Sequence, residues 1–73
     1  MTPSLFDHVY FRAATDPTSD PSKEWRDAIV MNVIGDPSDC IVDLVFRDWD
    51  GTLYLKYGVT RGGEFGQWEP TRP

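Results

Sequence analysis

Apolar and polar residues alternate along three segments of the chain, residues 5–13, 40–48 and 52–60, with the period of two that is typical of half-buried β-strands. In each segment, one set of alternate side chains is expected to face a core. These sets are Val9, Phe11 and Ala13 in the first segment, Cys40, Val42, Leu44 and Phe46 in the second, and Leu53, Leu55, Tyr57 and Val59 in the third. The pattern therefore predicts three strands, each with one buried face.

Two further segments complete the predicted sheet. Residues 24–34 also fit helical spacing, but the run of β-branched residues from about residue 27 favours a strand. Residues 65–70, FGQWEP, are predicted to form a short closing strand. Because Phe65 and Trp68 lie an odd number of positions apart, their side chains face opposite sides of that strand. We expect Trp68 to fill the core and Phe65 to lie at its rim.

Glycine, proline and aspartate separate these segments. Residues 35–39, Asp50-Gly51 and residues 61–64 are each predicted to form a turn. Residues 14–23 contain two Asp-Pro pairs and form a loop that is long for so small a domain, which makes it a candidate for partner contacts. In 73 residues this pattern predicts one all-β domain, a small five-stranded antiparallel SH3-like barrel, because closure removes free strand edges. An OB barrel fits less well, since no segment clearly encodes its helix.

Net charge argues against two classes of partner. Twelve acidic and seven basic residues give a formal net charge of −5, which is the wrong sign for binding along a phosphate backbone or an anionic membrane.

The aromatic residues are most simply assigned to the single core that a chain of this length can build. The N-terminus lacks the basic region and long apolar run of a signal peptide, so export by that route is not expected.

Few residues could carry catalysis or bind a metal. Cys40 is the only cysteine and His8 the only histidine. Cys40 belongs to a predicted core set, where a thiol acts as a small hydrophobe, and His8 lies on the polar side of its strand. The acidic pairs within residues 36–39 and 48–50 lie in predicted turns and lack the ligand number and spacing of a calcium loop. We expect no enzymatic activity, no metal and no cofactor.

The run DAIVMNVIGDPSDCIVDLVF, a later YGVT and a closing GQWEP form a set of strand motifs. These motifs resemble those of short proteins encoded by tailed bacteriophages and prophages, especially of actinobacterial hosts, which typically carry AAIVT-V, C-VNL-VF, TSV and GTWHWP. The matching positions are Ala28, Ile29, Val30 and Val33, then Cys40, Val42, Leu44 and Phe46, then Val59, and finally Gly66, Trp68 and Pro70. Asp43 replaces the common Asn, and the second His-Trp pair is absent. The resemblance implies a barrel and a phage origin, with the protein in the host bacterial cytoplasm or the virion, and it implies no activity.

Binding is the function that the remaining residues favour. On the outer face of the hairpin formed by residues 40–48 and 52–60, the alternation places apolar residues among charged ones. They are Ile41, Val45 and Tyr54, among Asp43, Arg47 and Lys56. Such a patch is more apolar than a solvated strand pair requires and is typical of an interface. Two interpretations stay open, burial under residues 14–23 or the N-terminal segment, and contact with a partner.

Trp49 lies in the predicted turn of this hairpin, where a side chain projects away from the sheet. A displayed Trp is a typical binding anchor. The alternative is that Trp49 folds back onto Trp25 or Trp68. The predicted partner-binding residues are Trp49, Tyr54, Ile41, Val45 and Arg47.

Three functions follow as hypotheses. The first is a non-catalytic interaction protein, either a virion-associated decoration subunit or a binder of a host protein. The second is an anti-defence protein that sequesters a nucleotide signal, with an aromatic ring on the base and cations on the phosphates, inside a homo-oligomer. Its ligand-binding residues would be Arg47, Lys56, Arg61 and Trp49. The third is an acidic nucleic-acid mimic that inhibits a DNA-binding protein. Its acidic residues would be Asp36, Asp39, Asp48 and Asp50.

Overall fold

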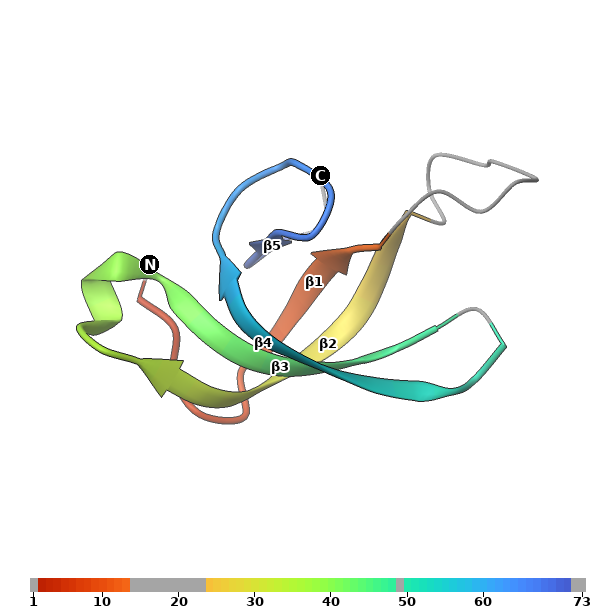
Figure 1. Cartoon of the computed structure of the whole chain (residues 1–73), viewed down its shortest axis with the longest axis horizontal. Coiled ribbons are helices and arrows are strands. Elements are labelled where there is room, and N and C mark those ends of the chain that lie inside the picture. The colour runs from red at the N-terminus through yellow and green to blue at the C-terminus, as the bar shows by residue number, and fades with distance from the viewer. Residues whose placement is uncertain (1, 14–23, 49, 72–73) are drawn as a thin grey trace.

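The computed structural model of the chain describes residues 2–13, 24–48 and 50–71. These residues form one antiparallel sheet with the strand order β4-β3-β2-β1-β5 (Figure 1). The strands are β1 (His8–Arg12), β2 (Trp25–Ile34), β3 (Ile41–Arg47), β4 (Leu53–Thr60) and β5 (Trp68–Glu69). A 3-10 helix, η2 (Pro37–Asp39), lies in the turn between β2 and β3. Within the described residues, no helix has the length and apolar character needed to cross a membrane.

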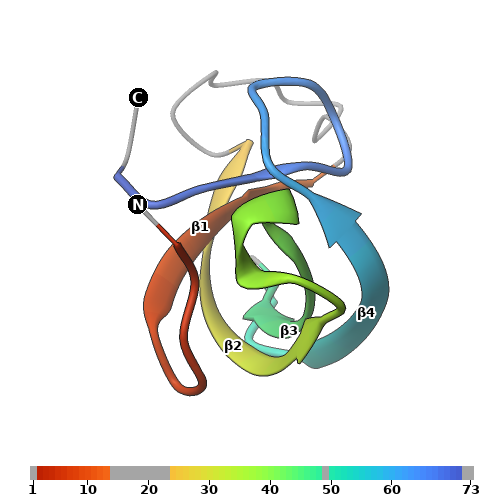
Figure 2. The same ribbon diagram turned by 90° about the vertical axis from the view of Figure 1, so that its left-hand side faces the viewer.

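The sheet is strongly curled into a half-barrel, and the C-terminal segment crosses its open side. Figure 2 shows β1 to β4 arranged in an arc, with the chain that leads to the C-terminus passing above them. β5 pairs with β1, and Trp68 of β5 also forms a bridge to Arg61, just after β4 ends. The N–H of Gly62 donates to the carbonyl oxygen of Trp68 at 3.0 Å. The predicted all-β fold is confirmed, and the shape is consistent with a small SH3-like barrel.

Two β-bulges meet at the middle of β3. In β4, Tyr57 and Gly58 together oppose the single residue Asp43, and in β2 Met31 is the extra residue beside Asn32. The Asp43 carboxylate bonds both bulges, because its Oδ1 accepts from the N–H of Gly58 at 2.9 Å and its Oδ2 accepts from Asn32 Nδ2 at 3.4 Å. Since a bulge bends its strand and increases the local twist, this arrangement contributes to the curl of the sheet.

The core lies on the inner side of the half-barrel, beneath β5. Its buried residues are Val9, Phe11, Ala13, Ala28, Val30, Val42, Leu44, Phe46, Val59 and Trp68. The inner faces predicted for the first two segments are therefore confirmed, with Cys40 packed at the edge of the core. Trp68 is 0% exposed, and its Nε1 donates to the carbonyl oxygen of Cys40 at 3.0 Å. The predicted role of Trp68 as the residue that fills the core is confirmed.

The inner face predicted for residues 52–60 is wrong at three of its four positions. Val59 is buried, but Leu53, Leu55 and Tyr57 are 66%, 48% and 72% exposed. The physical reason is the bulge at Gly58, because one extra residue reverses the face that the strand presents. Val59 therefore points inward, whereas the apolar residues before the bulge point outward.

Two strand boundaries also differ from those predicted. β2 begins at Trp25, which pairs with Arg12, rather than at about residue 27. The closing strand contains only Trp68 and Glu69, and it follows a turn in which Gly66 has a φ of 81° and donates its N–H to the carbonyl oxygen of Arg12 at 2.8 Å. The predicted loop at residues 14–23 lies outside the described residues.

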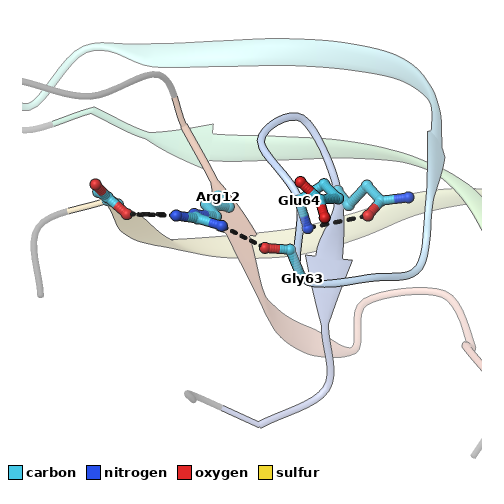
Figure 3. Close-up of polar contacts among 5 residues, drawn as sticks. Arg12, Gly63 and Glu64 are labelled. Atoms are coloured by element: carbon cyan, nitrogen blue, oxygen red, sulfur yellow. Dashed lines mark hydrogen bonds and ion pairs between the residues drawn. The ribbon is translucent and has the colours of Figure 1, made fainter. Parts of the chain in front are cut away.

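Arg12 joins the end of β1 to two other parts of the chain. Its Nη2 lies 2.9 Å from Glu24 Oε2, and its Nη1 donates to the carbonyl oxygen of Gly63 at 2.6 Å (Figure 3). The guanidinium carbon also lies 4.1 Å from the centroid of the Phe65 ring, a cation–π geometry. Phe65 is 49% exposed at the rim, as predicted. Arg12 therefore holds the turn after β4 against β1 and β2.

Candidate protein-binding face

The outer side of the sheet carries a row of apolar side chains that crosses three strands. Ile29 of β2 pairs with Val45 of β3, and Val45 pairs with Leu55 of β4. Residues that pair directly across antiparallel strands project on the same side, so the three side chains are neighbours. Ile29 and Val45 are half-buried and Leu55 is exposed. The row is therefore a continuous apolar strip on the side opposite Trp68.

Leu53 and Tyr57 extend this strip along β4. Each lies two positions from Leu55, Tyr57 as the first residue of the bulge, and so projects on the same side of the strand. We call Ile29, Val45, Leu53, Leu55 and Tyr57 the outer apolar face. Scattered exposed apolar residues are normal, but adjacent ones on one sheet face are the pattern that marks interaction sites.

Polar residues border the outer apolar face. His8 pairs with Ile29, and its Nε2 lies 3.3 Å from Asp27 Oδ1, while its ring lies 5.1 Å from that of Tyr10. On β3, the exposed Arg47 pairs with Leu53. An apolar centre with a polar and aromatic border is the usual composition of a protein interface.

The structure brings together some of the predicted partner-binding residues and separates others. Ile41, Val45 and Arg47 lie on the outer side of β3, as predicted. Tyr54 does not, because it pairs with the core residue Phe46 and stacks on it at 5.6 Å between ring centroids. Its assignment to the outer face is wrong, for the same reason that the inner face of β4 was mispredicted. Trp49 lies outside the described residues.

The predicted cation cluster is dispersed in the structure. Lys56 pairs with Leu44 and lies on the inner side of the sheet, whereas Arg47 lies on the outer side. Arg61 lies beyond the other end of the β3–β4 pair, where its Nε is 3.7 Å from Glu69 Oε2. The three cations therefore do not converge on one surface.

Carboxylates in the predicted turns stabilise those turns. Asp36 Oδ1 accepts two hydrogen bonds from Ser38, one from its N–H at 3.0 Å and one from its hydroxyl at 2.9 Å. These hydrogen bonds lower the pKa of Asp36. The N–H of Thr52 donates to Asp50 Oδ1 at 2.9 Å, and hydrogen bonding from Thr52 likewise lowers the pKa of Asp50. Both carboxylates are local caps of the kind expected for Asp in turns.

Other acidic residues have structural partners as well. Asp48 Oδ1 lies 3.3 Å from Nε of the buried Arg26, an ion pair that accommodates a cation inside the barrel. Asp39 lies in η2. Among the described residues, no three His, Cys, Asp or Glu side chains gather in a group that could hold a metal ion.

Cys40 and His8 occupy different environments. Cys40 adopts a left-handed backbone conformation at the end of η2, with a φ of 56°, and its Sγ lies 3.7 Å from the carbonyl oxygen of Ser38. His8 is an exposed residue at the border of the outer apolar face. A hydrophobic contact role for Cys40 and a border position for His8 agree with the sequence-based interpretation of both residues.

Three residues of the outer apolar face, Leu53, Leu55 and Tyr57, were missed as site residues by sequence reasoning. The one signal that could have found them is Gly58, since glycine inside a strand often marks a bulge.

Comparison of the chain with family models, with curated proteins and with solved structures finds no match.

Proposed function

We propose that this chain is a small, non-catalytic interaction protein of phage origin that binds a protein partner through the outer apolar face. The partner is a virion component or a host protein. The observation that carries the proposal is the exposed strip of Leu53, Leu55 and Tyr57 beside the in-register row of Ile29 and Val45. The resemblance of the strand motifs to short phage proteins supports the proposed origin.

The exposed side chains of the strip can contribute to the free energy of binding. Roughly half to three-quarters of Leu53, Leu55 and Tyr57 is exposed. Covering that surface contributes about 1–2 kcal/mol per side chain, given about 25 cal/mol for each Å² of apolar area removed from water. Arg47 and the Tyr10 ring at the border are residue types that are enriched in interfaces.

Protein binding is favoured over nucleotide sequestration by the positions of the cations. A nucleotide site in one chain requires cations that converge near an aromatic ring. Lys56 lies on the inner side and Arg47 on the outer side, while Arg61 lies near Glu69 at the far end of the hairpin. Sequestration would therefore require residues from more than one copy.

The experiment compares three forms of the tagged protein, the wild type, Leu55→Asp and Leu5→Asp. Leu5 is 54% exposed and lies outside the sheet strands, so it matches Leu55 in residue type and in exposure. Each form is used to capture proteins from infected host cells, and purified particles are analysed by mass spectrometry for the chain itself. Retention of one partner by the wild type and Leu5→Asp, with loss by Leu55→Asp, is expected. Equal capture by all three folded forms would contradict the proposed face.

A further inference from the structure

We propose that the exposed edge of β4 pairs with β4 of a second copy, in antiparallel orientation, to form a symmetric dimer whose two-fold axis passes beside Leu55. The dimer would join the two outer apolar faces into one binding surface. The role of that joined surface in binding a partner rests on the proposed function. The pairing itself is derived separately, from the backbone of β4.

The first step is that, in residues 2–13, 24–48 and 50–71, no strand pairs with the outer edge of β4. β4 is the last strand in the order of the sheet, and β3 is its one strand neighbour among the described residues. The parallel bridge of Arg61 to Trp68 covers the chain only after β4 ends. An edge strand presents unpaired N–H and C=O groups, and natural proteins usually protect such an edge with charges, prolines or bulges. In β4 the bulge lies at Gly58, so within the described part of the chain Lys56 is the one protecting feature of the segment before it.

The second step identifies which backbone groups point outward. The N–H of Asp48 donates to the carbonyl oxygen of Thr52 at 2.8 Å, so these two residues form a hydrogen-bonded pair of the antiparallel ladder. Such pairs alternate with non-bonded pairs along the ladder. Tyr54 is then in a hydrogen-bonded pair with β3, while the N–H and C=O groups of Leu53 and Leu55 point away from it. These groups are the donors and acceptors that a second strand would meet.

The third step is that β4 is complementary to itself in one register. When Leu55 lies opposite Leu55 of the second copy, Leu53 lies opposite Tyr57 and Lys56 lies opposite Tyr54. Apolar side chains thus meet on the outer side, and on the inner side each ammonium meets a phenol ring rather than another cation. A register shifted to place Lys56 opposite itself would instead set two like charges together. Residues 53–57 contain no Asp or Glu, so no two carboxylates face each other across the pair of β4 strands. The net charge of −5 therefore acts between the two copies only at long range.

The consequence for binding is a doubled surface. Across the axis, the row of Ile29, Val45 and Leu55 continues into the same row of the second copy in reverse order. This isologous arrangement is the usual geometry of a two-fold dimer. A partner would then meet a strip that crosses six strands, with the more exposed residues of β4 at its centre.

The test uses the purified full chain without any partner, in multi-angle light scattering from micromolar to millimolar concentration. The wild type should reach twice the chain mass of 8.3 kDa, and Leu55→Pro should remain monomeric. Proline at position 55 removes an N–H that points away from β3, so it is compatible with folding at a sheet edge. Circular dichroism checks the fold, and Leu53→Pro is a second edge variant in case the first does not fold. A wild type that is monomeric throughout overturns the dimer.

Disulfide formation tests the register. Leu55→Cys should form an intermolecular disulfide on mild oxidation, because directly paired Cα atoms lie about 5.5 Å apart. Lys56→Cys is the matched control and should not link, and the wild type accounts for any reaction of Cys40. Equal linking of both variants would overturn the proposed register. If light scattering finds a monomer while Leu55→Asp still loses the partner in the capture experiment, the dimer is refuted and the proposed function stands. If the chain is a dimer but Leu55→Asp captures the same partner as the wild type, the proposed function is refuted and the dimer stands.

Discussion

Replacing Trp68 with alanine should remove most of the stability of the domain. Trp68 is 0% exposed and lies between β1 and the chain that follows β4. Truncating a buried Trp to Ala costs about 3–5 kcal/mol. Loss of the bond from Nε1 to the carbonyl oxygen of Cys40 adds about 1 kcal/mol. A folded chain of this length has a free energy of unfolding of about 4–11 kcal/mol. The loss should therefore leave the variant marginally folded from the middle of that range and unfolded from its lower end.

The assay is urea unfolding followed by far-UV circular dichroism, because three Trp residues would complicate fluorescence. With a urea slope of about 1 kcal/mol per molar for a small domain, Trp68→Ala should lower the midpoint by several molar. Trp68→Phe retains much of the ring and should lose less, and Phe65→Ala at the rim should lose little. Truncation before Gly66 should unfold the chain, as Trp68→Ala does. A midpoint for Trp68→Ala close to that of the wild type would refute the assignment of Trp68 as the residue that closes the core.

Three further predictions concern polar contacts. Asp43→Ala should lower the free energy of unfolding by about 1–3 kcal/mol. Asp43→Asn, which keeps an acceptor for the N–H of Gly58, should lose less. A urea midpoint of Asp43→Ala equal to that of the wild type would contradict this role. Arg12→Gln should lower the free energy of unfolding by about 1–2 kcal/mol, because the ion pair and the cation–π contact of Arg12 are lost. Thermal unfolding at neutral pH measures this loss, and an unchanged Tm would contradict the role of Arg12. Because folding lowers the pKa values of Asp36 and Asp50, their stabilisation is complete above their unfolded pKa of about 3.9 and is lost as the pH falls through the folded values. The double variant Asp36→Asn/Asp50→Asn should therefore have a shallower acid dependence of its urea midpoint below pH 4, and a parallel dependence would contradict the caps.

Alternation was sufficient to predict the faces of β1 and β3, because neither strand contains an extra residue. Val9 and Phe11 of β1, and Val42 and Leu44 of β3, all face the core. In an uninterrupted strand, side chains alternate strictly, so the sequence period and the structural faces agree. The same reasoning identified Val45 and Arg47 as outer-side residues of the candidate site.

The face of β4 could not be predicted in this way, because apolar residues continue at every second position through the bulge. Leu53, Leu55 and Tyr57 therefore have the same sequence pattern as the buried Val59. The feature that separates them is the pairing of Gly58 with Asp43, a contact between residues fifteen positions apart. Glycine within a strand is a signal for such a bulge, but the partner that stabilises it is a property of the tertiary structure.

If Gly58 is only the extra residue of the bulge, its deletion should leave both faces of β4 unchanged. Without Gly58, Tyr57 and Val59 become adjacent and point to opposite sides by ordinary alternation, while Val59 keeps its pairing with Val42. The deletion should lower the free energy of unfolding by about 1–2 kcal/mol, since the hydrogen bond to Asp43 is lost.

Leu55→Asp, added to the deletion, should cost no more stability than it does in the full chain, because Leu55 still points outward. Val59→Asp should unfold the deletion variant and the full chain alike, since it places a charge in the core. If Leu55→Asp instead becomes strongly destabilising after the deletion, then Leu55 has turned inward. The exposure of the outer apolar face would then depend on the extra residue itself, and the chain would hold its binding strip outside the core only by retaining the bulge.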